Sequence, residues 1–277
     1  MASFKDLSDT KALKHLHADT IVVLVEGGSD VEFLERMFPG MKAEIRFEAV
    51  GGCTVMKERL QDERKLNPKV IGLLDRDALM REKRWDELFE TDNDIFQAAT
   101  AIWIEGLYVL TRWEIENYLL DLAAVSRLFS CFKVTAAPDE NSLLDMMIES
   151  ALGELHVTAG WCTAHENEIP QHSGPDSCAD THALETLVRK WLASYLPQYD
   201  NHLEKVKAFD LGEAAEKRER LAALLRMVDG KRFILRLQRR WMGINKDPSL
   251  QLADNVGQLS SRSDDLFHLM DTLRKSA

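Results

Sequence analysis

The segment Ile21-Val-Val-Leu-Val-Glu-Gly-Gly-Ser-Asp30 gives the clearest indication of the fold class. Its first five residues are apolar and mostly β-branched, which is typical of a strand that is buried on both faces of a parallel sheet. The Glu-Gly-Gly turn ends this strand, because glycine permits a tight change of direction. Apolar residues then recur at helical spacing, at Val31, Phe33, Leu34, Met37 and Phe38. The pattern predicts a strand, a tight turn and a helix, in that order.

The same rhythm continues along the chain. A second uninterrupted apolar run, Val70–Leu74, ends at Asp75-Arg76-Asp77. We therefore expect an α/β fold with a Rossmann-like, mainly parallel sheet that is flanked by helices and joined by right-handed crossovers. The expected elements after the first helix are a strand at 44–50, a helix at 55–66, a strand at 70–74, a helix around 85–89 and a strand at 107–110.

The pattern changes after Glu114, where long helical periodicities replace the strands. Residues 158–180 are rich in Gly, Pro, Ser, His and Asn and predict a long loop. We expect a catalytic α/β domain at residues 1–125 and a mostly α-helical domain at residues 126–277 that provides substrate, partner or dimer contacts. The helices of this second part are expected at 115–129, 143–155, 183–195 and 214–241, the last interrupted at Asp229-Gly230.

The composition is that of an acidic globular protein. The 277 residues carry a net charge of −11, and 45% of them are hydrophobic. No apolar stretch approaches the roughly 20 residues that a membrane-spanning helix needs, and the first residues lack the pattern of a signal peptide. We therefore expect a cytoplasmic protein without membrane contacts. The four cysteines are expected to be reduced rather than paired in disulfides.

Acidic side chains follow two of the expected strands. Glu26 comes directly after the first strand, and Asp75 and Asp77 follow the strand at 70–74. The carboxyl ends of parallel strands lie at one edge of a sheet, so these carboxylates would repel one another there unless a cation neutralised them. Such hard oxygen ligands suit Mg²⁺ or Mn²⁺. The alternative for Asp-Arg-Asp by itself is a surface turn.

The residues beside Glu26 fit the same interpretation. Gly27 and Gly28 lack side chains where a phosphate backbone would have to come close to Glu26. Asp30 is expected either to contact a metal-associated water or to cap the following helix. No Gly-x-x-x-x-Gly-Lys-Ser/Thr sequence occurs in the chain, which excludes a P-loop ATPase within these residues.

Three segments together resemble the Toprim domain family. Val25–Leu34 followed by Leu73–Asp77 is similar to the Toprim signature, in which a strand-end Glu-Gly turn is paired with a later Asp-x-Asp. Arg112–Leu120 resembles the Ile-Glu-Asn-Tyr-Leu block of OLD-like Toprim nucleases, in particular the Toprim effectors of PARIS anti-phage systems. The motifs cover residues 20–125, and the helical part is similar only in general layout. The resemblance implies a Toprim fold for the α/β domain.

The resemblance also implies roles for single residues. Glu26 would act as a metal ligand or general base, and Asp75 and Asp77 as metal ligands. Glu116 would reach the same metal centre; the alternative is an exposed glutamate that opens a helix. In OLD-like nucleases a lysine after the Toprim core assists the developing phosphorane. Lys231 is the best candidate here, the alternative being a solvated member of a basic band.

The activity that the resemblance implies is metal-dependent hydrolysis of phosphodiester bonds. It further implies a toxic effector that cleaves host RNA, with tRNA favoured, after release from a separate ATPase sensor, and that is a homodimer when active. Two alternatives are an OLD-type DNA nuclease and a catalytically idle Toprim scaffold that binds the ATPase sensor. Tyr108 and Tyr118 are interpreted as core or stacking residues rather than as topoisomerase nucleophiles.

A basic band stands out in this acidic chain. Residues 214–241 hold nine basic and three acidic residues, a local balance of +6. Arginines at helical spacing could bind nucleic-acid phosphate while a tryptophan stacks on a base. The alternative is an amphipathic helix that docks its apolar face and leaves its arginines solvated. The residues concerned are Arg232, Arg236, Arg239, Arg240 and Trp241.

Cysteines and histidines in and beside the expected loop have a spacing that a zinc ion could use. They are Cys162, His165, His172, Cys178 and His182. The short spacings differ from those of a standard zinc finger, and the alternative is a set of solvated histidines.

Overall fold

The structure is a computed structural model that describes residues 20–132, 137–170, 179–260, 262 and 264–275. Its contacts divide the chain into two units. One comprises residues 1–74, 98–109 and 262–277, and the other comprises residues 75–97 and 110–261. The expected domain boundary at residue 125 falls inside helix α7 (Leu122–Cys131), which belongs wholly to the second unit.

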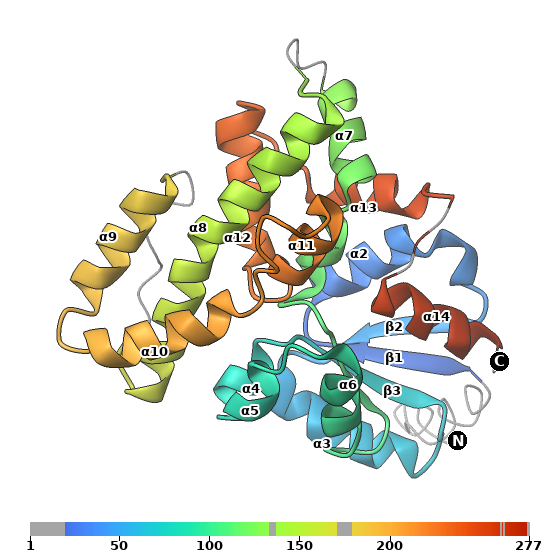
Figure 1. Ribbon diagram of the computed structural model, residues 1–277. Helices are drawn as coiled ribbons and strands as arrows, with labels where there is room; N and C mark the ends of the chain where they lie inside the picture. Colours follow the sequence, from blue (N-terminus) through green and yellow to red (C-terminus); the bar gives the residue numbers. More distant parts are fainter. Residues whose placement is uncertain (1–19, 133–136, 171–178, 261, 263, 276–277) are drawn as a thin grey trace, which may run out of the picture. The chain divides into compact units, whose positions relative to one another are not determined.

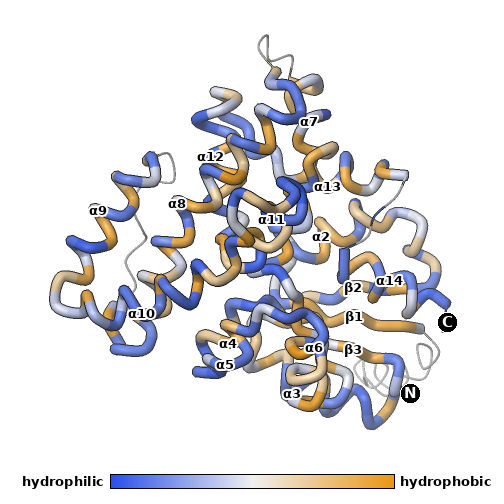
Figure 2. The backbone as a smooth tube through the Cα atoms, in the orientation of Figure 1, coloured by the Kyte–Doolittle hydropathy of each residue, from blue (hydrophilic) through white to orange (hydrophobic). Residues whose placement is uncertain are grey.

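The first unit is built on a four-stranded parallel sheet (Figure 1). Every residue of the first strand is at most 2% exposed, as expected of an apolar run without polar alternation. Figure 2 shows β1 and β3 as hydrophobic segments. The expected α/β class and parallel sheet are confirmed. In spatial order the strands are β2 (Ile45–Ala49), β1 (Ile21–Val25), β3 (Val70–Leu74) and β4 (Leu107–Val109).

Helices join the strands of this unit. α2 (Gly28–Met37) packs on β1 and β2, and α3 (Cys53–Arg64) packs on β1 and β3. The chain therefore goes from β1 to one side of the sheet and then crosses back past β1 to reach β3. In such sheets the crevice at the carboxyl ends of the two strands where the order reverses is the usual ligand position, and these strands are β1 and β3.

A helix near the end of the chain, α14 (Asp265–Lys275), also belongs to the first unit. The sequence patterns had not indicated it. Its Phe267 stacks on Phe38, with 6.5 Å between the ring centroids. Phe38 leads into a short 3-10 helix, η2 (Pro39–Met41).

The second unit is helical. Its longest helix, α8 (Glu140–Glu166), contacts α9, α10 and α11, while α7 packs on α13. No helix within the described ranges is long and apolar enough to cross a membrane. The other elements are α4 (Ala78–Arg81), α5 (Trp85–Leu88), η3 (Ile115–Leu119), α9 (Thr181–Trp191), α10 (Leu196–Lys207), α11 (Lys217–Leu224), α12 (Gly230–Arg236), its π-helical continuation η4 (Leu237–Trp241) and α13 (Ser249–Gly257), while α6 (Asn93–Ala101) spans the division between the units.

The prediction of a loop at residues 158–180 is wrong for residues 158–166, because α8 continues to Glu166. Gly160 does not break the helix, since it makes room for a neighbouring helix. A Cβ there would lie 2.8 Å from Cγ1 of Val188 and 3.2 Å from Cζ3 of Trp191, both on α9. Glycine serves close helix packing here rather than a turn.

The prediction of a single helix at residues 115–129 is also wrong, because the segment forms two elements. The 3-10 helix η3 ends at Leu119, and α7 begins at Leu122 with Asp121 as its N-cap. The Asp121 carboxylate accepts hydrogen bonds from the N–H groups of Ala123 and Ala124. Such a cap starts a new helix because it satisfies N–H groups that have no partner within the helix.

Candidate metal centre

Three carboxylates meet at the carboxyl ends of strands β1 and β3. Glu26 directly follows β1, and Asp75 and Asp77 follow β3. Each offers one carboxylate oxygen, and these oxygens lie within 4.8 Å of one another. The three side chains are partly exposed. Within the described residues, these three side chains lie close enough together to hold a metal ion.

The sheet explains why these carboxylates meet. β1 and β3 are neighbouring parallel strands, with Val22 opposite Val70 and Leu24 opposite Gly72. Both strands therefore end at nearly the same level. This edge is also where the strand order reverses, so the acidic group occupies the position where ligands of parallel α/β sheets bind.

Neighbouring residues hold the two aspartates in different ways. Oδ1 of Asp75 accepts a hydrogen bond from the N–H of Ile115 at 3.1 Å. Oδ1 of Asp77 accepts one from Nη2 of Arg81 at 2.7 Å, and the N–H of Asp77 donates to the carbonyl of Trp113 at 3.2 Å. These contacts tie the segment after β3 to the segment that leads into η3.

Arg76, between the two aspartates, is fully buried. Its guanidinium donates to the backbone carbonyls of Leu88, Thr111 and Glu90 at 2.7 to 3.1 Å and lies 4.2 Å from the ring centroid of Phe96. Arg76 lies in the turn that leads from β3 into α4, and in this turn its side chain enters the interior while the carboxylates of its two neighbours meet Glu26. The sequence patterns had not indicated a role for Arg76.

The donor set fits a hard divalent cation. Carboxylate oxygens are the ligands that Mg²⁺ and Mn²⁺ prefer in proteins. Three negative charges at this spacing are costly unless positive charge offsets them. The group could therefore bind a metal ion, and its chemistry suits Mg²⁺ and Mn²⁺ alike.

Asp30, also expected near the metal, caps helix α2. Its Oδ2 accepts a hydrogen bond from the N–H of Gly27 at 2.8 Å, and its Oδ1 accepts one from Oγ of Ser29 at 3.3 Å. Of the two roles expected for Asp30, the cap is the one that the structure shows. A Cβ added at Gly28 would meet nothing within 4 Å, so the start of α2 has open space beside it.

Lys231 lies against two glutamates. Its Nζ is 2.6 Å from Oε2 of Glu114 and 3.3 Å from Oε1 of Glu116, and its backbone N–H donates to Oε1 of Glu114 at 2.8 Å. Burial alone would lower the pKa of Lys231, but Glu114, Glu116 and Asp75 outweigh burial and raise it, so the amine stays protonated. Glu116 is 3% exposed, so it is not the exposed glutamate of the alternative interpretation.

Glu114 is a residue of this cluster that sequence reasoning missed. It is 4% exposed; burial and the nearby Asp229 raise its pKa, whereas the charge and the hydrogen bonds of Lys231 lower it. Its position two residues before Glu116 was the available signal. That signal was faint, because its partner Lys231 lies 117 residues away along the chain.

Close packing of α12 on η3 brings the lysine to these glutamates. A Cβ at Gly230 would lie 2.8 Å from the backbone nitrogen of Asn117, which is closer than a side chain can come. Asn117 binds both segments: its Nδ2 donates to the carbonyl of Val228 at 2.8 Å, and its Oδ1 accepts from the N–H of Glu114 at 3.0 Å. Glycine at position 230 therefore sets how near the lysine can come.

The basic band divides into a buried and an exposed part. Arg236 is 2% exposed, and its Nη2 lies 3.5 Å from Oε1 of Glu154. Nε of Arg232 donates to the other carboxylate oxygen of Glu154 at 2.7 Å. Buried Glu154 thus pairs with two of the arginines expected to bind nucleic acid, and the structure does not place Arg236 where a phosphate could reach it.

Of the five residues expected to bind nucleic acid, Arg239 and Arg240 are exposed and Trp241 is partly exposed beside them. The Trp241 ring meets Phe233 edge to face, with 5.8 Å between centroids. Phe233 is fully buried, so this contact anchors one side of the indole in the core. Binding of nucleic acid by these three residues stays a prediction.

The residues considered for zinc are spread over different elements. Cys162 and His165 lie on α8, and His182 is exposed on α9. Burial raises the pKa of the Cys162 thiol, which disfavours the thiolate that zinc requires. His172 and Cys178 lie outside the described residues.

Of the two tyrosines, Tyr118 lies in the core and Tyr108 is half-buried on β4. Tyr118 is 2% exposed and lies under the guanidinium of Arg112, 4.8 Å from its ring centroid. Burial, with a contribution from Asp265, raises the pKa of Tyr108. These surroundings agree with the interpretation of both residues as core or stacking residues.

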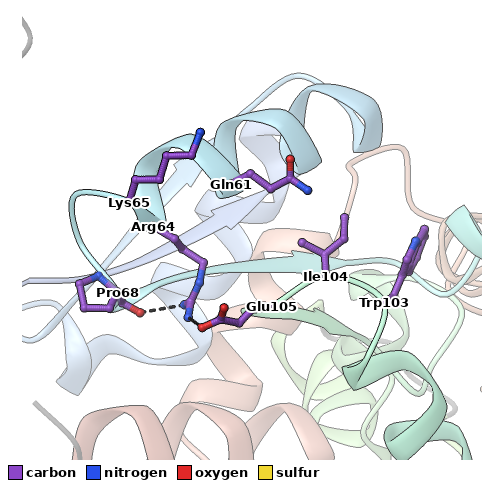
Figure 3. Close-up of a pocket in the computed structure, with 7 residues that line it drawn as sticks. All are labelled: Gln61, Arg64, Lys65, Pro68, Trp103, Ile104 and Glu105. Carbon is purple, nitrogen blue, oxygen red and sulfur yellow. Dashed lines mark hydrogen bonds and ion pairs between the residues drawn. The ribbon is translucent and has the colours of Figure 1, made fainter.

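A separate hollow of 630 Å³ lies in the first unit (Figure 3). Arg64 crosses it and donates to the carbonyls of Pro68 and Val70, each at 2.8 Å, and to Glu105 at 2.7 Å. These bonds brace the loop before β3 against the loop before β4. The hollow therefore lies at the opposite end of β3 from Asp75.

No protein-family model matches the chain. Curated proteins also give no match.

Proposed function

We propose that this protein is a Toprim-type nuclease that uses Mg²⁺ or Mn²⁺ to hydrolyse phosphodiester bonds. The observation that carries the proposal is the approach of Glu26, Asp75 and Asp77 to within 4.8 Å at the ends of two neighbouring parallel strands. Ligands of parallel α/β sheets bind at this position. The resemblance of the same residues to the Toprim signature favours phosphodiester chemistry over other metal-dependent reactions.

All three carboxylates would bind the cation, and Glu26 would also act as the general base. Asp75, Asp77 and Glu26 would hold the cation through carboxylate oxygens. A bound divalent cation supplies positive charge at a phosphodiester and so favours its attack by water. The water oxygen forms a bond to phosphorus as a Glu26 oxygen accepts its proton, the bond between phosphorus and the leaving oxygen breaks, and the leaving oxygen takes a proton from solvent.

Lys231 supplies a further positive charge. Its side chain is 60% exposed, so its amine can reach a ligand while Glu114 holds its backbone and keeps the amine protonated. A protonated amine beside the phosphate offsets the charge that develops on the phosphate oxygens. Glu116, 3.3 Å from the amine, orients it in this arrangement, and its direct binding of a metal ion stays a prediction.

We further propose that the substrate is RNA, with tRNA favoured, and that the protein is a toxic anti-phage effector. This part follows from the resemblance to the Toprim effectors of PARIS systems. That resemblance also implies release from an ATPase sensor and a homodimer as the active form. By the same resemblance the ATPase would be a separate protein, and no P-loop motif occurs among these residues. Arg239 and Arg240 are exposed members of the basic band and could contact RNA phosphate.

Cleavage assays test this proposal. We expect the purified protein to cleave tRNA in Mg²⁺ or Mn²⁺ and to leave it intact in EDTA. Glu26→Gln and Asp75→Asn each remove a ligand charge and are expected to lower cleavage by about 100-fold or more. Glu32→Gln is the matched control, because Glu32 lies in the same segment but pairs with Arg36 at the surface. It is expected to keep full activity.

The same assay with plasmid DNA separates the alternatives. Cleavage of DNA but not of tRNA would identify a DNA nuclease and contradict the RNA part of the proposal. Cleavage of neither substrate would contradict the proposal as a whole and leave the scaffold interpretation.

A further inference from the structure

Arg81 lies beside one of the proposed metal ligands. It is the last residue of α4, and its Nη2 is 2.7 Å from Oδ1 of Asp77, four residues earlier. Both side chains are accessible, with exposed fractions of 40% for Arg81 and 27% for Asp77. A cation of the protein therefore already occupies one oxygen of the acidic group.

We propose that Arg81 exchanges partners when the metal centre fills. Without a divalent cation it pairs with Asp77; when a cation takes Asp77, the guanidinium contacts a phosphate of the RNA substrate. The inference rests on the proposed function and assigns Arg81 as a substrate-binding residue.

The Arg81–Asp77 pair is suited to such an exchange because it is weak. It joins two residues one helical turn apart at the surface, where water screens the charges and two mobile side chains must be ordered. A divalent cation places twice the charge on the same carboxylate and is a preferred partner of its oxygen. The cation is therefore expected to displace the guanidinium without disturbing the fold.

A guanidinium also suits the second partner. Its planar fork donates two parallel hydrogen bonds to phosphate oxygens as well as it does to a carboxylate. Lys231 lies on α12, where its charge interacts with that of Asp75, whereas Arg81 on α4 contacts Asp77 directly. Each of the two aspartates thus has its own cation of the protein nearby, and both cations are accessible enough to meet a bound phosphate.

The next two cations of the same segment are directed elsewhere. Nζ of Lys83 lies 3.7 Å from Oε1 of Glu168, and Arg84 pairs with Glu87. Lys83 therefore offers a matched control: its loss changes the net charge equally, two residues from Arg81, without touching the acidic group.

The test compares Arg81→Ala, Arg81→Lys and Lys83→Ala in the full-length protein. Mn²⁺ binding without RNA is measured from the electron paramagnetic resonance signal of unbound Mn²⁺. Binding of fluorescent tRNA is measured by anisotropy in Ca²⁺. We expect Arg81→Ala to bind Mn²⁺ about three- to tenfold more tightly, because a competing positive charge has gone. It should bind tRNA about tenfold more weakly, because one charge-assisted contact is lost.

The two other variants test whether both effects come from the charge, the shape and the position of the Arg81 guanidinium. Arg81→Lys keeps the charge but not the fork, so its Mn²⁺ affinity should stay within about twofold of wild type and its tRNA affinity should recover only in part. Lys83→Ala should change either affinity by less than about twofold, because its charge lies farther away and is screened.

Three results would overturn the exchange. One is equal behaviour of Arg81→Ala and Lys83→Ala, and another is weaker Mn²⁺ binding in Arg81→Ala, which would give Arg81 a supporting role in the site. The third is tighter Mn²⁺ binding with unchanged tRNA affinity. If wild-type Mn²⁺ binding does not depend on Glu26, the proposed function fails together with the exchange. If it does, and Arg81→Ala leaves it unchanged, the exchange alone fails.

Discussion

Replacing Gly230 with alanine tests how closely α12 must approach η3. Gly230 is the first residue of α12, and the added Cβ would lie 2.8 Å from the backbone nitrogen of Asn117 and 2.9 Å from Cβ of Glu116. Backbone cannot yield as the end of a flexible side chain can. The start of α12 must therefore move away from η3, and Lys231, the next residue, must move with it.

The expected loss can be worked out from this geometry. Overpacking of a close contact costs about 1–3 kcal/mol. The backbone N–H of Lys231 binds buried Glu114, so displacement also weakens a hydrogen bond to a charged group worth about 1.5–3 kcal/mol. Against this loss, the higher helix propensity of alanine relative to glycine stabilises α12 by up to about 1 kcal/mol. Because the helix start can relax in part, we expect a net loss of about 2 kcal/mol in the free energy of unfolding.

Urea unfolding followed by circular dichroism measures this loss, provided that the variants share one m-value. Gly28→Ala is the matched control, because Gly28 is likewise the first residue of its helix but has nothing within 4 Å of an added Cβ. It should be neutral or stabilised by up to about 1 kcal/mol. Equal unfolding midpoints for the two variants would refute the argument from close packing.

Three further predictions concern buried groups. Arg76→Met deprives buried carbonyls of their donor and should cost about 3 kcal/mol or more, whereas Arg36→Met at the surface should cost little; thermal unfolding compares them. Burial lowers the pKa of His156 to about 4 from 6.5, so the unfolded chain binds more protons between these values. The contribution of neutral His156 to the free energy of unfolding should be fully present above pH 6.5 and should fall by up to about 3 kcal/mol toward pH 4. Urea unfolding at pH 7 and pH 5 tests this, and His156→Gln should make the free energy of unfolding less dependent on pH. Iodoacetamide should label exposed Cys131 in the folded protein and buried Cys162 only after unfolding, and native labelling of Cys162 by peptide mass spectrometry would contradict this.

The features that could be predicted from the sequence have short-range causes. An uninterrupted apolar run such as Ile21–Val25 requires cover on both faces, which is why the parallel sheet could be expected before its partners were known. The approach of Glu26 to the two aspartates followed from the same reasoning, because parallel strands end at one edge. Capping is local too, and Asp30 was correctly assigned a possible capping role.

Helix boundaries were less predictable where packing overrides composition. Gly160 looked like part of a loop, yet it lies inside α8 because Val188 and Trp191 need the space that a side chain would fill. Asp121 separates η3 from α7 although the apolar periodicity runs through it. In both cases the deciding contact lies outside the periodic pattern that was used to place the helices.

The α/β class, the buried strands and the acidic residues at their ends could be predicted from the sequence, because these features depend on neighbours along the chain and on the common direction of parallel strands. Which charges meet depends on the packing of segments that are far apart in the chain. Lys231 and Glu114 are 117 residues apart, and Arg236 and Glu154 are 82 apart. A cation at helical spacing has the same local pattern whether water or a buried carboxylate faces it, and only the packing of distant helices makes that choice.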